Sequence, residues 1–125
     1  MQIVISKNIP QPKGHYSPCI THNGIVYVSG QLPFHQKTRE IPEGIEKQTW
    51  QVLQNLELIL NEAGSSTAKV LQMRIYIPKM EMWDLVNKIY AEFFGAHKPV
   101  RCIVPTRELH YGCLIEIEAT AFVEQ

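Results

Sequence analysis

Charge of one sign is not in excess in this sequence, and cysteine is scarce. The 125 residues include 12 Lys and Arg against 12 Asp and Glu, so bulk charge gives no attraction for nucleic acid or for an anionic membrane. The three cysteines, Cys19, Cys102 and Cys113, are odd in number and have no patterned spacing. That usage argues against a disulfide framework and is typical of free thiols in a reducing cytosol.

Long hydrophobic runs, internal repeats and low-complexity tracts are also missing. No apolar stretch approaches the roughly 20 residues needed to cross a bilayer. The first residues lack the basic region, apolar segment and small-residue cleavage site that mark a signal peptide. The length suits one hydrophobic core, and no linker divides the chain. We therefore expect residues 1–125 to form a single soluble, cytoplasmic domain.

Short runs rich in β-branched residues dominate the first part of the chain. Residues 2–6 and 16–22 predict two strands, and residues 25–28 predict a third that ends at Ser29-Gly30. Asn23-Gly24 separates the second run from the third, and both residues tolerate positive φ. This dipeptide predicts a tight hairpin.

Two helices are predicted from apolar residues at helical spacing. We expect one over about residues 43–63 and another over about residues 82–94, each stopped by a glycine. Further strands are expected over about residues 69–77, in the run that follows Pro99, and over about residues 114–123. Two helices among about six strands indicate an α+β fold, a single sheet layer with both helices on one face.

The last predicted strand has two unlike faces. One face carries only apolar side chains, Ile115, Ile117, Ala119 and Ala121. The other face is mixed and consists of Glu116, Glu118, Thr120 and Phe122. We expect the helices to cover the apolar face. The mixed face would then meet another subunit or line a pocket, so self-association with closed symmetry is expected.

Two charged residues lie in runs that otherwise indicate core strands. Arg101 precedes Cys102, Ile103 and Val104, and Glu116 lies between Ile115 and Ile117. Burying a charged side chain in such a position costs free energy of desolvation unless the charge is paired or serves in a functional site. The two side chains form either a structural ion pair on neighbouring strands or a pocket in which a cation and a base act on a small carboxylate.

A series of short motifs occurs along nearly the whole chain in a characteristic order. The motifs are Gly14-His15-Tyr16-Ser17, Ser29-Gly30-Gln31-Leu32-Pro33, Gln48, Asn55-Leu56, Val86-Asn87 with Tyr90, Pro99-Val100-Arg101 and Ile115-Glu116-Ile117-Glu118-Ala119. Together they resemble the reactive-intermediate deaminase family, also called RidA, YjgF or L-PSP. The joint order and spacing are far more specific than any single motif.

This resemblance implies a fold, an assembly and a reaction. The implied fold is a chorismate-mutase-like α+β layer, and the implied assembly is a homotrimer with its sites in clefts between subunits. The implied reaction is hydrolysis of enamine and imine intermediates, such as 2-aminoacrylate, to 2-keto acids and ammonia. No metal or organic cofactor is implied, and the substrates are small 2-imino and 2-enamino acids.

The resemblance also assigns roles to residues of this chain. Arg101 matches the arginine that binds the substrate carboxylate, and Glu116 matches the glutamate that activates water. Tyr16, Ser29 and the backbone of Gly30 match residues that form the wall of the family's pocket. The backbone amide of Ile103 lies where the family donates a further hydrogen bond to the ligand. A guanidinium suits the first role because its parallel N–H donors match both carboxylate oxygens. A glutamate in the second role acts as general base and then acid.

The chain departs from the usual pattern of the family at several positions. His15 and His110 stand where proline is usual, and Val100 stands where alanine is usual. The usual cysteine two residues after the arginine is Ile103 here, with Cys102 one place earlier. These departures bear on substrate preference more than on the chemistry, because the arginine and the glutamate are both present.

Some residues of the chain also allow other interpretations. His15 with Cys19, and His110 with Cys113, resemble metal half-sites but share no ligand motif. Cys102 adjoins Arg101 and therefore points to the opposite face of its strand, where a buried thiol is expected.

Two alternative functions remain open. The first is a non-catalytic protein that binds small carboxylates such as 2-keto acids, using the same arginine. The second is the endoribonuclease role of some relatives, which neutral charge and the lack of a basic stripe disfavour. The presence of Glu116 favours catalysis, because a binder gains nothing from a carboxylate that faces an anionic ligand.

Overall fold

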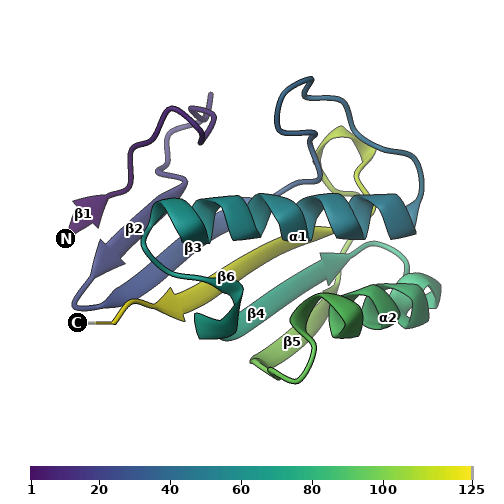
Figure 1. Ribbon diagram of the computed structural model, residues 1–125. Helices are drawn as coiled ribbons and strands as arrows, with labels where there is room; N and C mark the ends of the chain where they lie inside the picture. The colour runs from purple at the N-terminus through teal and green to yellow at the C-terminus, as the bar shows by residue number, and fades with distance from the viewer. Residues whose placement is uncertain (125) are drawn as a thin grey trace.

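The computed structural model describes residues 1–124 as one six-stranded sheet with two helices (Figure 1). The sheet order is β1-β2-β3-β6-β4-β5, and every neighbouring pair is antiparallel except the parallel pair β4 and β5. The bounds are β1 Gln2–Ile3, β2 Cys19–His22, β3 Ile25–Gln31, α1 Ile45–Glu62, β4 Val70–Ile77, α2 Trp83–Phe94, β5 Val100–Pro105 and β6 Glu116–Phe122. The predicted α+β layer is confirmed.

The boundaries of the first two strands differ from the prediction. β1 is only Gln2–Ile3, although the Val4 N–H still donates to the Cys19 carbonyl at 3.0 Å. β2 begins at Cys19 rather than at residue 16, directly after Pro18, which has no N–H to offer a ladder. The β2–β3 hairpin is as predicted, with Asn23 at φ 51° and Gly24 at φ 78°.

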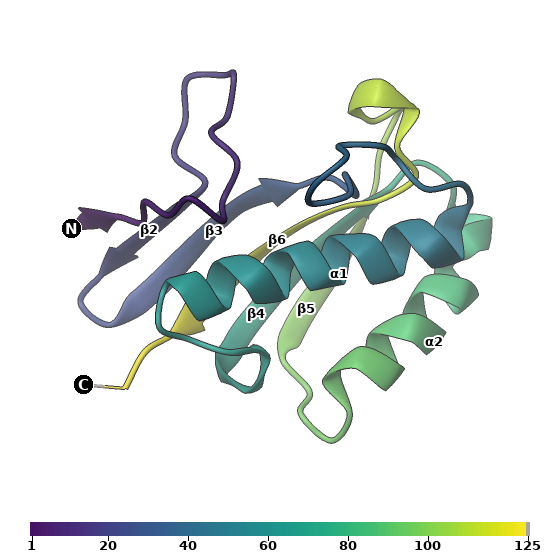
Figure 2. The same cartoon turned by 45° about the horizontal axis from the view of Figure 1, so that its top comes forward.

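Both helices lie on the same face of the sheet (Figure 2). The predicted apolar face of β6 is the face they cover, and all four of its side chains are buried: Ile115, Ile117, Ala119 and Ala121. Val52, Leu56 and Leu60 of α1 and Val86 of α2 pack in the same core. The period-2 pattern of one strand and the helical pattern of two helices therefore meet in one core.

The other face of the sheet carries no helix and mixes polar with apolar side chains. The Tyr76 hydroxyl donates to Glu118 Oε1 at 2.5 Å, and Arg74 Nε lies 3.9 Å from the same oxygen. The hydrogen bond to Glu118, with burial, raises the pKa of Tyr76 to about 12. Cys102 also lies on this face. It is exposed in the single chain, so the expectation of a buried thiol was wrong.

This open face exposes apolar side chains such as Tyr27 and Val100. The expected self-association stays a prediction. No helix among residues 1–124 is both long enough and apolar enough to cross a membrane.

Candidate functional site

Glu116 is the first residue of β6 and lies on the open face of the sheet, against Gly30 of β3. Its neighbour Ile117 is buried under the helices, so alternation turns Glu116 the other way. A Cβ at Gly30 would overlap Glu116 Oε2. Gly30 is not one of the glycines with positive φ, so its backbone conformation does not require glycine. Glycine is needed at this position because the carboxylate occupies the space that a side chain would take.

The segment before β2 closes around the same place. The β3–β6 register shifts between Val28 and Gln31, which marks a bulge at Ser29-Gly30. Ser29 Oγ donates to the Ser17 carbonyl at 2.5 Å, and the Ser29 N–H donates to the Pro18 carbonyl at 3.0 Å. These bonds bring the segment that carries Tyr16 against the bulge. The structure thus brings together four of the predicted site residues, Tyr16, Ser29, Gly30 and Glu116, which we call the acidic half-site.

The ionisation of Glu116 is perturbed in this setting. Burial, followed by the negative charge of Glu118, raises the pKa of Glu116 above its ordinary value. His110 opposes that shift. His110 stacks on Tyr111 with ring centroids 3.9 Å apart, in the turn that leads to β6. A carboxylate whose pKa is raised toward neutrality is suited to general acid–base catalysis.

Gly30→Ala is expected to lower the free energy of unfolding by about 1–3 kcal/mol, because the new methyl group overpacks the niche that holds Glu116. Chemical denaturation measures the change. Adding Glu116→Ala should recover part of the loss, since the clash is with that carboxylate. A double variant as unstable as the sum of both changes would contradict this explanation of Gly30.

Arg101 lies on β5, at the edge of the sheet, and its side chain is on the helix side. Its guanidinium carbon lies 4.7 Å from the Trp83 ring centroid and 4.8 Å from that of Tyr90. Nη1 donates to Asn87 Oδ1 at 2.9 Å. Two rings and one amide of α2 therefore hold the guanidinium in a fixed plane.

Arg101 has no carboxylate partner within residues 1–124. The one salt bridge among residues 1–124 joins Arg74 to Glu118. A structural ion pair between Arg101 and Glu116, one of the two interpretations left open by the sequence, is therefore absent in the single chain. The side chain is exposed and keeps donors for a ligand.

The backbone of β5 adds a donor beside this guanidinium. Thr106, directly after the strand, donates its N–H to the Ile77 carbonyl of β4 at 3.0 Å. Backbone amides alternate in direction along a strand, so the Ile103 amide points away from β4. β5 has no other neighbour in the sheet, and the Ile103 N–H is on the open edge. We call Arg101 with the Ile103 amide the cationic half-site.

A cavity of about 450 Å³ opens next to Arg101, between α2 and the turn that leads into β5. Asn87, Tyr90, Lys98 and Arg101 are among its lining residues. The Tyr90 hydroxyl is buried there without a hydrogen-bond partner in the described part of the chain, residues 1–124. Burial raises the pKa of Tyr90, and the positive charge of Arg101 opposes this. The surroundings of Arg101 thus have room for a ligand and a spare hydroxyl.

The two half-sites do not meet within one chain. Arg101 pairs in register with Met73, and Met73 pairs with Ala119, both buried on the helix side. Glu116 lies on the opposite side, three residues before Ala119 in β6. Strand β4 also separates β5 from β6, so the expectation of neighbouring strands was wrong. One chain supplies a cation at one edge and a base on the other face.

The comparisons with known proteins agree with this architecture. The family described as "Endoribonuclease L-PSP" matches residues 6–123. A "RutC family protein" of Pyrococcus horikoshii is 40% identical, with 98% of each chain covered. The crystal structure of a Rid family protein, YyfA of Yersinia pestis, matches with a TM-score of 0.92 at 40% identity, covering 98% of each chain.

The chain belongs to the L-PSP family. The resemblance seen in the sequence is confirmed, and so is the chorismate-mutase-like layer. A further solved relative is Escherichia coli TdcF with bound serine, with a TM-score of 0.93 at 28% identity, covering 99% of this chain and all of that one. That L-PSP relative binds a small molecule with an α-carboxylate.

Three side chains that hold Arg101 were not predicted as site residues: Trp83, Asn87 and Tyr90. Asn87 and Tyr90 entered the sequence analysis only as part of a motif. The signal was their spacing, because residues 83, 87 and 90 follow the i, i+4, i+7 pattern of one helix face. Among residues 1–124 there is no group of three or more His, Cys, Asp or Glu that could hold a metal.

Proposed function

We propose that this L-PSP family member hydrolyses enamine and imine intermediates, such as 2-aminoacrylate, to 2-keto acids and ammonia. The observation that carries the proposal is the division of the site. An unpaired, ring-held Arg101 lies at an open strand edge, and Glu116 with a raised pKa lies in a niche on the other face. Neither half serves the reaction alone.

The proposed active form is a homotrimer in which each cationic half-site faces the acidic half-site of the next copy. Two different surfaces that meet head to tail generate a ring when the rotation closes. The open sheet face, with its mixed polar and apolar side chains, supplies the surface for such a contact. Three equivalent sites per ring follow from this arrangement.

Arg101 would bind the substrate carboxylate through two parallel N–H donors and so fix both its position and its plane. The Ile103 amide adds a donor that needs no reorganisation. Asn87 and the rings of Trp83 and Tyr90 hold the guanidinium in place, so it does not change orientation when the substrate moves. Tyr16, Ser29 and Gly30 of the next copy would form the opposite wall.

Glu116 would act on the water that attacks the substrate. The enamine first tautomerises to the imine, whose carbon is already electrophilic. Glu116 accepts a proton from water as the oxygen bonds to that carbon, and returns the proton to nitrogen, which gives a carbinolamine. Glu116 then carries the proton of the new hydroxyl group to the nitrogen as the C=O bond forms and the C–N bond breaks, so ammonia leaves and the 2-keto acid remains. Such general base and acid catalysis is worth roughly 10²–10⁴-fold.

The burial of the Glu116 charge leads to a stability prediction. A raised pKa means that the folded chain binds this proton more readily than the unfolded chain, so the free energy of unfolding falls as pH rises through that window. Glu116→Gln, placed in Arg101→Ala protein so that no guanidinium offsets the charge, should therefore raise the melting temperature at pH 7. Scanning calorimetry at several pH values should show that the gain disappears below the ordinary pKa of a glutamate. A gain that grows toward low pH would contradict the assignment.

The proposed activity is tested by generating 2-aminoacrylate in situ with a serine dehydratase and following keto-acid release. Wild-type protein should accelerate release above the spontaneous rate in proportion to its concentration. If binding of pyruvate is measurable but release is unchanged, the chain is a carboxylate binder, an alternative supported by the serine bound to TdcF. Incubation of the same preparation with RNA tests the activity in the family's description.

A further inference from the structure

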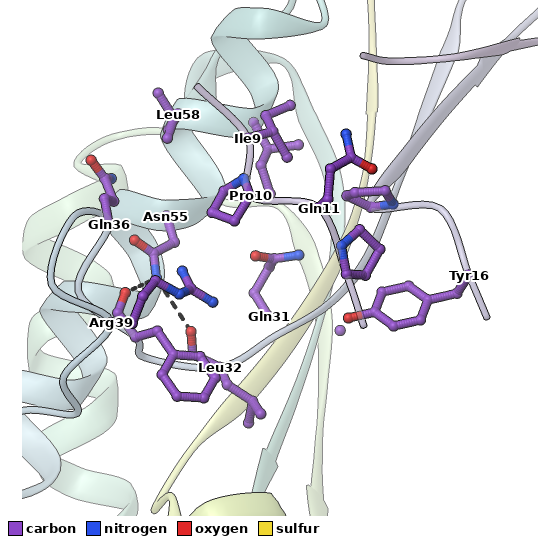
Figure 3. Close-up of a pocket in the computed structure, with 15 residues that line it drawn as sticks. Ile9, Pro10, Gln11, Tyr16, Gln31, Leu32, Gln36, Arg39, Asn55 and Leu58 are labelled. Atoms are coloured by element: carbon purple, nitrogen blue, oxygen red, sulfur yellow. Dashed lines mark hydrogen bonds between the residues drawn. The ribbon is translucent and has the colours of Figure 1, made fainter. Parts of the chain in front are cut away.

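A second cavity, of about 120 Å³, lies on the helix side of β3, away from Arg101 (Figure 3). Its walls come from the segment before β2, the end of β3, the loop that follows and the outer side of α1. Gly30 lies between the cavity and Glu116: the cavity is on one side of β3, and the Glu116 carboxylate is on the other. Tyr16 and Gly30 of the acidic half-site lie at its edge. The proposed reaction uses neither the α1 wall of this cavity nor the charged side chain that enters it.

That side chain belongs to Arg39, whose backbone has an unusual conformation. Arg39 has φ 63°, a left-handed conformation that is unfavourable for a residue with a Cβ. A tight turn imposes it: the His35 N–H donates to the Glu40 carbonyl at 2.8 Å, and the Arg39 N–H to the His35 carbonyl at 3.0 Å. Residues held in such conformations cluster at functional sites.

The Arg39 guanidinium is directed into the cavity and is not neutralised there. Its central carbon lies 4.7 Å from the Phe34 ring centroid, and Figure 3 shows it extending into the hollow. No salt bridge or side-chain hydrogen bond of Arg39 is formed within residues 1–124. The strained turn therefore presents a free cation at the mouth of an otherwise uncharged space.

The walls around Arg39 combine apolar and polar side chains, and the loop that forms one of them is well fixed. Pro10, Leu32 and Leu58 are among the apolar lining residues, and Gln11 and Gln31 are among the polar ones. Asn55 of α1 holds the loop in place, because its Nδ2 donates to the Leu32 carbonyl at 3.2 Å and to the Phe34 carbonyl at 2.8 Å. Asn55 is itself buried. The cavity is thus preformed rather than dependent on a mobile loop.

We propose that this cavity is a second ligand site, which binds a small organic monocarboxylate with its charge on Arg39 and its apolar body against α1. The volume limits the body to about one benzene ring or a short branched chain, since a cavity of about 150 Å³ holds benzene. One cation at the mouth matches one carboxylate. The site goes beyond the proposed hydrolysis, because it needs neither Arg101 nor Glu116.

Benzoate is the probe, titrated into the intact isotope-labelled protein by NMR, with the side-chain amides of Gln36 and Asn55 as reporters. Benzamide has the same shape without the charge and should bind at least tenfold more weakly. Arg39→Gly should weaken benzoate binding at least tenfold and yet raise the melting temperature by about 3 °C, because glycine accepts the left-handed φ. Arg39→Asn, which also tolerates that conformation, checks that loss of charge is responsible.

Arg101→Ala separates this site from the proposed active site. Benzoate should shift Gln36 and Asn55 in that variant as it does in wild type, whether or not the protein hydrolyses 2-aminoacrylate. Three results would each overturn the proposal: equal binding of benzamide, unchanged binding by Arg39→Gly and Arg39→Asn, or shifts confined to the surroundings of Arg101.

Discussion

Arg101→Ala is expected to lower kcat/KM for 2-aminoacrylate by about 10²–10³-fold, the range found when one partner of a close charge pair is removed. The loss has two parts. The carboxylate loses its bidentate partner, and the imine carbon loses the orientation that places it before Glu116. Keto-acid release from enzymatically generated 2-aminoacrylate measures the change.

Two further variants show which property of Arg101 matters. Arg101→Lys keeps a positive charge but not the planar fork, so we expect an activity between those of Arg101→Ala and wild type. Arg107→Ala removes an exposed arginine from the loop after β5 and should leave turnover unchanged. An Arg101→Ala protein within twofold of wild type would refute the carboxylate-binding role.

Glu116→Gln is expected to lower kcat by about 10²–10⁴-fold while binding of pyruvate is kept. Glutamine fills the niche beside Gly30 but takes no proton from water. Loss of a negative charge near an anionic ligand also removes a repulsion, so the affinity for pyruvate should stay equal or rise. Single-turnover kinetics and calorimetric titration separate the two effects.

Glu108→Gln is the matched control for Glu116, since it removes an exposed loop carboxylate and should change neither rate nor affinity. A Glu116→Gln protein with normal kcat would show that water is activated by another group. Lost pyruvate binding with unchanged kcat would instead place Glu116 in ligand binding.

The arrangement of elements was largely predictable because each local pattern agrees with the core that forms. The alternation in β6 correctly indicated which face the helices cover, and Asn23-Gly24 correctly indicated the hairpin. The short β1 was less predictable. Residues 4–6 have strand composition, but β2, the partner strand, begins only at Cys19. The end of β1 is therefore set by its pairing with β2, a segment distant in the sequence, and not by the local preference of residues 4–6 for strand.

The geometry of the site was less accessible from the sequence than its residues. Strand order is a property of the whole sheet, and no local pattern indicates that β4 inserts between β5 and β6. That insertion, with the side-chain alternation, moves Arg101 and Glu116 to opposite faces. Arg39 was also missed, because only the folded loop forces a residue with a Cβ into a left-handed conformation.

Complementation between two inactive variants tests the central claim, a site shared between copies, most directly. Arg101→Ala and Glu116→Gln proteins are refolded together in equal amounts, and the deaminase rate is compared with that of wild type. In a trimer with Arg101 from one copy and Glu116 from the next, random mixing restores about one site in four, so about a quarter of the wild-type rate should return. If each site lay within one chain, every site would carry a defect. A mixture no more active than the sum of its parents would therefore contradict the account.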